Sequence, residues 1–142
     1  MTIDDAERAR RRALVHAHMQ VENAHDVDAI MATFSTDAEM LYNGQSFHDH
    51  DAIRAAHAYL GLSAASGAFR GLRLVPDAEH VTADEIVIEG RMCGTHVADF
   101  ESFPPTGRDV EMPYVAFYRF DAGGKLVSER VVMNLGALRE RR

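Results

Sequence analysis

Residues 94–120 constrain the fold of this chain most strongly, because they read as two β-strands joined by a loop. The loop contains Pro104, Pro105 and Gly107. Prolines cannot donate ladder hydrogen bonds and glycine tolerates a positive φ, so the two strands must separate there. Alternate residues of the second strand share one face, and these are Met112, Tyr114, Ala116, Tyr118 and Phe120. An apolar face with two phenols beside a histidine is typical of a small-molecule cavity, and equally of a half-buried sheet.

Strand patterns also flank this stretch. Residues 69–75, 85–96, 110–120 and 125–134 read as long strands, and Asp-Ala-Gly-Gly at 121–124 is a hairpin turn between the last two. The segment 38–42 reads as a short strand that ends in the turn dipeptide Asn43-Gly44.

Three helices are predicted in the first 60 residues. Thr2 and Asp5 have the spacing of a capping box, and the helix they begin continues to about Ala24 with Leu14, Val15, His18, Val21 and Glu22 along one side. Asp26 caps a second helix with the apolar face Val27, Ile30, Met31 and Phe34. Asp49 or Asp51 caps a third, striped by Ile53, Ala56, His57 and Leu60.

Helices followed by a meander of long antiparallel strands predict an α+β fold, with the helices on one face of a curved sheet. The 142 residues are enough for one domain with a real core, and we expect a single domain over 1–142.

Composition excludes several classes of function. A net charge of -7 offers no basic surface for nucleic acid or anionic lipid. The run of arginines at 8–12 lies beside acids in a predicted helix and reads as a solvated face. No apolar run approaches the roughly 18–20 residues of a membrane span. The single Cys93 excludes an internal disulfide and fits a reducing cytoplasm.

Four segments in their order along the chain carry a family resemblance: ENAHDVDAIMATF (22–34), GTH (94–96), PPTGR (104–108) and GGKLVSERVVMN (123–134). Over nearly its whole length the chain resembles the SnoaL-like polyketide cyclases of the nuclear transport factor 2-like superfamily. The resemblance implies a cone of three helices on a strongly curved sheet, and a homodimer formed through the outer sheet face. It also implies cyclisation of aromatic polyketides by an intramolecular aldol step, with neither metal nor organic cofactor. Relatives of these cyclases include steroid isomerases, dehydratases, epoxide hydrolases and pure binding proteins.

The acid–base pair that the resemblance implies is missing here. Val131 stands where the cyclases have an aspartate, and Ala116 where they have the assisting histidine. Other relatives carry an aspartate at the position of Asn134. Neither valine nor alanine can take a proton, and an amide has no useful pKa.

The remaining polar residues supply the predicted site. His96 matches the histidine of GTH and is the candidate base, and Asn134 is the candidate donor to an oxyanion. The residues expected to bind the substrate are Tyr42, Tyr114, Ala116, Tyr118, Val131 and Asp99. Each has a structural alternative: a hydrogen-bonded strand end for His96, backbone capping for Asn134, core packing for the tyrosines and a solvated loop for Asp99.

Other charged residues are given structural roles. Glu129 and Arg130 are neighbours on a strand, so at most one of them faces the cavity. Helix packing or capping accounts for Glu22 and Asn23. The His-Asp-His-Asp run at 48–51 lacks a metal-ligand spacing and its acids suit a helix cap, so we expect no metal site.

Two functions fit these residues. In the first, the protein is a cofactor-independent cyclase, isomerase or dehydratase that removes a proton next to a carbonyl of a hydrophobic, polyketide- or steroid-like molecule. In the second, the same cone binds an apolar ligand or a protein and catalyses nothing. The family resemblance and His96 favour the enzyme, while Val131 and Ala116 favour the binding protein.

Overall fold

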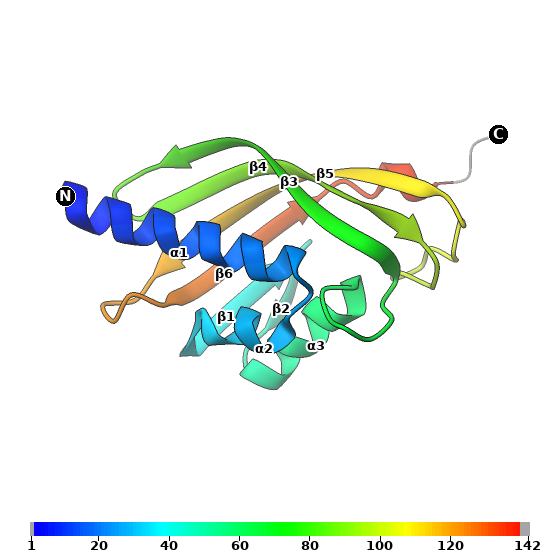
Figure 1. Cartoon of the computed structure of the whole chain (residues 1–142), viewed down its shortest axis with the longest axis horizontal. Coiled ribbons are helices and arrows are strands. Elements are labelled where there is room, and N and C mark those ends of the chain that lie inside the picture. The colour runs from blue at the N-terminus through cyan, green and yellow to red at the C-terminus, as the bar shows by residue number, and fades with distance from the viewer. Residues whose placement is uncertain (1, 140–142) are drawn as a thin grey trace.

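Three helices lie against one face of a six-stranded sheet in the computed structural model, which describes residues 2–139 (Figure 1). The helices are α1 (Asp5–Asn23), α2 (Val27–Ala32) and α3 (His50–Leu60). The strands are β1 (Phe34–Tyr42), β2 (Gln45–Phe47), β3 (Phe69–Val81), β4 (Glu85–His96), β5 (Asp109–Phe120) and β6 (Leu126–Met133), and a 3₁₀ turn follows at Gly136–Leu138. The predicted α+β class, with N-terminal helices on a curved, mostly antiparallel sheet, is confirmed.

The strand order is β2-β1-β6-β5-β4-β3, so the last strand of the chain lies beside the first long one. β1 and β6 run parallel, whereas the other neighbours in the described sheet are antiparallel. Figure 1 shows the sheet curling around the helices, with α1 crossing its concave side. Register shifts in β3 at Arg70/Arg73 and Pro76/Ala78 mark bulges, and bulges bend a strand and strengthen its twist.

The helix boundaries follow from their caps. The first helix is capped by Asp4, whose carboxylate accepts from the Glu7 N–H, so the predicted capping box of Thr2 and Asp5 is wrong. Asp4 has the same chemistry as the predicted cap and stands one residue before the helix. The predicted caps Asp26 and Asp49 are confirmed: their carboxylates accept from the N–H groups of Ala29 and Ala52.

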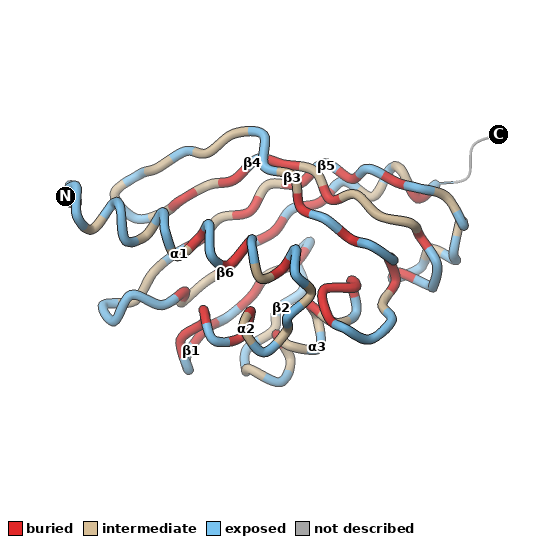
Figure 2. The backbone as a smooth tube through the Cα atoms, in the orientation of Figure 1, coloured by how far each residue is buried: buried red, intermediate tan, exposed pale blue. Residues whose placement is uncertain are grey.

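The core lies between α1, α3 and the concave sheet face. The burial pattern of β5 alternates as predicted, with Met112, Tyr114, Ala116 and Tyr118 buried (Figure 2). Of the two neighbouring charged residues in β6, Glu129 is buried, while Arg130 is exposed and its guanidinium lies over the Phe117 ring. The strand predicted at 69–75 is longer and runs on to Val81. Among residues 2–139 no helix is long and apolar enough to cross a membrane.

Candidate functional site: a buried histidine–glutamate ring

Two histidines and two glutamates alternate in a ring under the concave face of the sheet. His18 Nε2 lies 2.9 Å from Glu129 Oε2 and 3.4 Å from Glu22 Oε1. His57 Nε2 lies 3.4 Å from Glu22 Oε2 and 3.6 Å from Glu129 Oε1. All four residues are buried. Each histidine therefore faces two carboxylates, and each carboxylate faces two histidines.

Three elements bring the ring together. His18 and Glu22 are four residues apart on α1, so they share one helix face. His57 lies on the buried stripe of α3, beside Ile53 and Leu60. Glu129 is an inward position of β6 and is paired with Tyr118 across the β5–β6 ladder.

The outer nitrogen of each ring histidine is held by an oxygen acceptor. The Thr33 hydroxyl donates to the Ile30 carbonyl at 2.6 Å, so its oxygen accepts from His18 Nδ1 at 2.8 Å. His57 Nδ1 donates to the Ile53 carbonyl at 2.8 Å. With Nδ1 protonated in both residues, each Nε2 either carries a second proton or offers its lone pair to the ring.

Burial and mutual attraction act in opposite directions on the charges of the ring. Burial by itself lowers the pKa of His18, but the Glu22 and Glu129 carboxylates outweigh it and raise that pKa to about 10. Burial likewise favours the neutral form of Glu22, but His18 and His57 lower its pKa to about 2. The pKa of His57 is raised in the same way, burial being outweighed by Glu22 and Glu129.

Polar atoms in the ring and beside it lack partners. Within residues 2–139, Glu22 Oε1, His57 Nε2 and the Tyr114 hydroxyl are buried and have no hydrogen-bond partner. The four potential ligand atoms of the ring lie within 4.8 Å of one another, close enough to share one ion.

A small chamber opens onto the ring. The volume that the centre of a water molecule can occupy in this chamber is about 10 Å³. This is enough for roughly one water. Glu22, His57 and Glu129 line it, and the other walls are formed by Met40, Tyr42, Leu60, Leu62, Leu74, Met92, Tyr114, Ala116, Tyr118 and Val131. The polar groups therefore gather on one side of an otherwise apolar chamber.

Gly90 makes room for Tyr114 at the chamber. A Cβ at Gly90 would lie 2.6 Å from the Val75 carbonyl oxygen and 2.9 Å from Tyr114 Cε1. The absence of a side chain at Gly90 thus lets the Tyr114 ring lie across the neighbouring strand. Burial and the carboxylates of Glu22 and Glu129 raise the pKa of Tyr114, which keeps its hydroxyl protonated.

The structure brings five predicted substrate-binding residues together around the chamber: Tyr42, Tyr114, Ala116, Tyr118 and Val131. Ala116 and Val131, the positions of the missing acid–base pair, are partners in the β5–β6 ladder. The Tyr42 hydroxyl lies 3.6 Å from Met133 Sδ.

His96 does not line the chamber. It is buried at the end of β4, its ring stacks on Phe69 at 5.1 Å between centroids, and its Nδ1 accepts from the Thr106 N–H at 3.2 Å. Its backbone also bonds to Gly107 and Arg108. These contacts anchor the Pro-Pro loop to the sheet.

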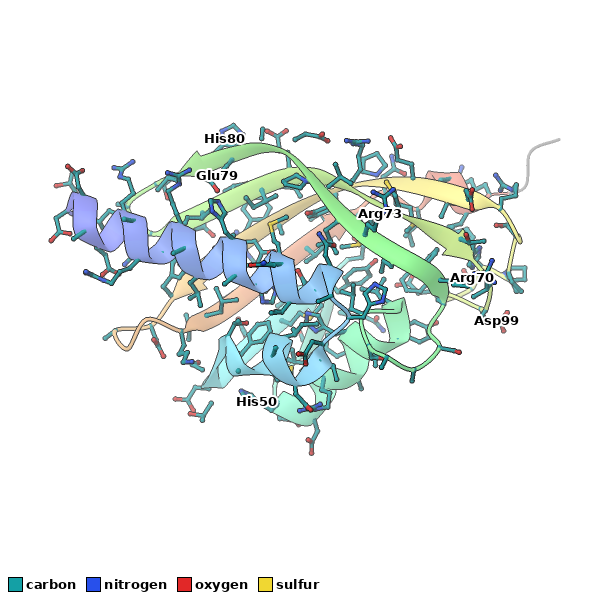
Figure 3. All side chains as sticks on the ribbon, viewed as in Figure 1. His50, Arg70, Arg73, Glu79, His80 and Asp99 are labelled. Carbon is teal, nitrogen blue, oxygen red and sulfur yellow. The ribbon has the colours of Figure 1, made fainter. Side chains whose placement is uncertain are left out.

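Asn134 and Asp99 also lie outside the chamber. Asn134 is exposed, and its Oδ1 accepts from the Gly136 N–H at 2.8 Å, at the start of the C-terminal turn. Asp99 is exposed in the loop after β4, at the same end of the molecule as Arg70 (Figure 3). Neither residue contributes a polar group to the ring.

Sequence reasoning missed the ring, although two signals pointed to it. His18 and Glu22 lie on the apolar side of the predicted first helix, where ionisable residues are rare unless paired. His57 stands on the apolar stripe of the third helix in the same way.

Comparisons with known proteins agree with this architecture. A family model described as the SnoaL-like domain matches residues 15–129. A proposed SnoaL-like polyketide cyclase from Jannaschia species CCS1 is similar in structure, with a TM-score of 0.81, 18% identity and 94% of each chain covered. No curated protein matches the chain in sequence.

Two further structures show the range of proteins with this fold. AclR of Streptomyces galilaeus, a proposed hydroxylase, has a TM-score of 0.74 and 25% identity over 92% of this chain and 78% of its own. SalBIII, an epoxide hydrolase/cyclase-like enzyme of pyran ring formation in the polyether salinomycin, has a TM-score of 0.75 and 19% identity. Its match covers 92% of this chain and 95% of its own.

Proposed function

The chain belongs to the family of SnoaL-like domains, and from that premise we propose that it is an enzyme acting on a hydrophobic, oxygenated small molecule. The proposed reaction begins with removal of a proton next to a carbonyl group and needs no organic cofactor. Cyclisation, isomerisation and dehydration share this first step. The observation that carries the proposal is the buried ring of His18, Glu22, His57 and Glu129 at one side of an apolar chamber.

The roles follow from which ring members reach the chamber. Glu22 and His57 line it, and each has a buried atom without a hydrogen-bond partner among residues 2–139, Glu22 Oε1 and His57 Nε2. The imidazole of His57, in its neutral form, takes the substrate proton at Nε2 and returns it, while the Glu22 carboxylate stabilises the imidazolium that forms. The Tyr114 hydroxyl lines the same chamber and donates to the oxygen of the developing enolate. His18 lies behind Glu129 and positions it through the 2.9 Å contact.

The chamber must expand to admit such a molecule, because its present room suits roughly one water. Met40 and Met92 are among its walls, and methionine side chains are flexible enough to repack. The small volume is also the observation that favours the second candidate, a binding protein without catalysis.

The experiment is proton exchange in deuterated water. Purified protein, freed of metal ions with a chelator, is incubated with a panel of cyclic enones and flat polyketide-like ketones, and deuterium uptake next to the carbonyl is followed by NMR. We expect exchange that falls by about 10²–10⁴-fold in His57→Gln, the range that an acid–base group supplies. Absence of exchange across the panel would reject the enzyme and leave the binding protein.

Three further variants make the assay specific. Glu85→Gln alters a glutamate whose carboxylate bonds to Arg119 and Arg130, away from the chamber, and should leave exchange unchanged. His96→Gln tests the base that sequence reasoning predicted, and Asn134→Ala the predicted donor. If exchange is lost in His96→Gln and Asn134→Ala but kept in His57→Gln, then His96 and Asn134 are the catalytic residues.

We also propose a homodimer through the outer sheet face, in a reducing cytoplasm. Val132 is 61% exposed on that face, and Val87 and Val115 are only half-buried there. Covering these side chains would remove apolar surface from water. Light scattering should give twice the chain mass, and Val132→Glu should yield monomers. A monomeric wild-type protein would reject the dimer.

A further inference from the structure

The ring brings the four donors of a candidate metal site close together. Its four histidine-to-glutamate contacts measure 2.9, 3.4, 3.4 and 3.6 Å and use both oxygens of each carboxylate. One donor atom from each of the four residues also lies within 4.8 Å of the other three. In a tetrahedral zinc site with bonds of about 2.0–2.1 Å, neighbouring donors lie roughly 3.3–3.4 Å apart. Small shifts of the side chains would thus place all four donors on one ion.

The histidines are already oriented for ligation. A metal-bound histidine almost always donates its other N–H to a carbonyl, carboxylate or comparable acceptor, which fixes the ring and leaves the second nitrogen for the metal. His18 does so to the Thr33 hydroxyl oxygen and His57 to the Ile53 carbonyl. Both Nε2 atoms face the carboxylates of Glu22 and Glu129.

Charge and missing partners point the same way. Two buried carboxylates need two positive charges, which either two protons on the histidines or one divalent cation can supply. Within the described chain His57 Nε2 and Glu22 Oε1 have no hydrogen-bond partner, although both are buried. Protons alone therefore leave the ring incompletely bonded, whereas an ion at its centre would contact every member.

We propose that His18, Glu22, His57 and Glu129 bind one divalent transition-metal ion, with Zn²⁺ the best fit. Two imidazole nitrogens suit Zn²⁺, Ni²⁺, Cu²⁺ or Fe²⁺, while Mg²⁺ and Ca²⁺ prefer oxygen ligands alone. Glu22, His57 and Glu129 also line the chamber, so the ion would lie beside it. The ion displaces the ring protons and occupies the lone pair of His57, so the loaded ring cannot perform the proposed proton transfer. The inference does not rest on that function, because it needs only the four donors.

The test uses the full chain after treatment with a chelator. Zn²⁺ is titrated in competition with a chromophoric chelator, and Co²⁺ is added separately as a spectroscopic probe. We expect one ion per chain and the intense visible absorption of four-coordinate Co²⁺. His57→Gln and Glu22→Gln each remove a ligand and should weaken Zn²⁺ binding by more than the roughly 10–100-fold that loss of an outer partner costs.

Two more variants keep the test decisive. Thr33→Val retains all four ligands and removes only the acceptor of His18 Nδ1, so a weakening of about 10–100-fold is expected even if a ligand variant fails to fold. His96→Gln changes a buried histidine outside the ring and should bind Zn²⁺ like the wild type. Binding that is absent, or equal in wild type, His57→Gln and Thr33→Val, would overturn the inference. A failure to bind Zn²⁺ would not affect the proposed proton exchange by the metal-free protein. Likewise, a failure to exchange protons would not affect the proposed Zn²⁺ binding.

Discussion

Breaking the contact between His18 and Glu129 should reveal a strong coupling within the ring. The two side chains are almost completely buried and 2.9 Å apart. Removing one partner of a buried charge pair costs about 3–5 kcal/mol, because the other is left uncompensated. A hydrogen bond to a charged group contributes about 1.5–3 kcal/mol. We therefore expect His18→Gln and Glu129→Gln each to cost up to about 5 kcal/mol, and the double variant about 1.5–3 kcal/mol less than their sum.

The chain offers a matched pair for comparison on the same helix. His16, two residues before His18, bonds to Glu79 of β3 at the surface, where the His16 side chain is 54% exposed. Exposed ion pairs couple by about 0.2–1 kcal/mol. The cycle with His16→Gln and Glu79→Gln should therefore give a much smaller coupling. Figure 3 shows Glu79 on β3, beside α1.

The assay is urea unfolding of the four proteins of each cycle, followed by far-ultraviolet circular dichroism with a chelator present. The pH is held below ~6.5, the pKa of a free histidine side chain, so that the histidine of each pair can be charged. Domain stabilities of about 5–15 kcal/mol leave most single variants folded. A coupling for the buried pair no larger than for the surface pair would refute the charge-paired ring.

Two further predictions concern Gly90, which lies beside the chamber, and His96, which lies outside it. Gly90→Ala should destabilise the fold by about 1–3 kcal/mol and reduce proton exchange, because its Cβ would lie 2.9 Å from Tyr114 Cε1. Gly123→Ala, whose Cβ would meet Asp121 Oδ1 at 3.5 Å, is the control in the same unfolding measurement. His96→Gln should reduce the decrease in the free energy of unfolding at acid pH. The reason is that burial, together with the nearby charge of Arg108, lowers the pKa of His96 below 6.5. The unfolded chain then binds the proton more readily, so wild-type stability falls as the pH drops through 6.5. Unfolding curves of both proteins from about pH 8 to about pH 5 check this, and parallel losses would contradict it.

The elements were predictable because each depends on local chemistry. The alternation in 110–120 fixed the inward face of β5, and the aspartates Asp26 and Asp49 fixed two helix starts. The first cap was misassigned because Asp4 and Thr2 both suit that role and only Asp4 reaches the Glu7 N–H.

The ring could not be predicted because it depends on contacts between distant segments. Glu129 is 111 residues from His18, and the parallel pairing of β6 with β1 brings it under α1. Local periodicity leaves open which of Glu129 and Arg130 faces inward, and the structure selects Glu129. His96 stands at a strand end where the chain leaves for the Pro-Pro loop, so its family motif says little about which way its ring points.

A crystal structure of the metal-free protein with a bound cyclic ketone tests the central claim most directly. We expect the carbonyl oxygen within hydrogen-bonding distance of the Tyr114 hydroxyl, and the neighbouring carbon facing Glu22 and His57 in an expanded chamber. A ketone bound instead beside His96 and the Pro-Pro loop, with the ring of His18, Glu22, His57 and Glu129 still closed, would contradict it.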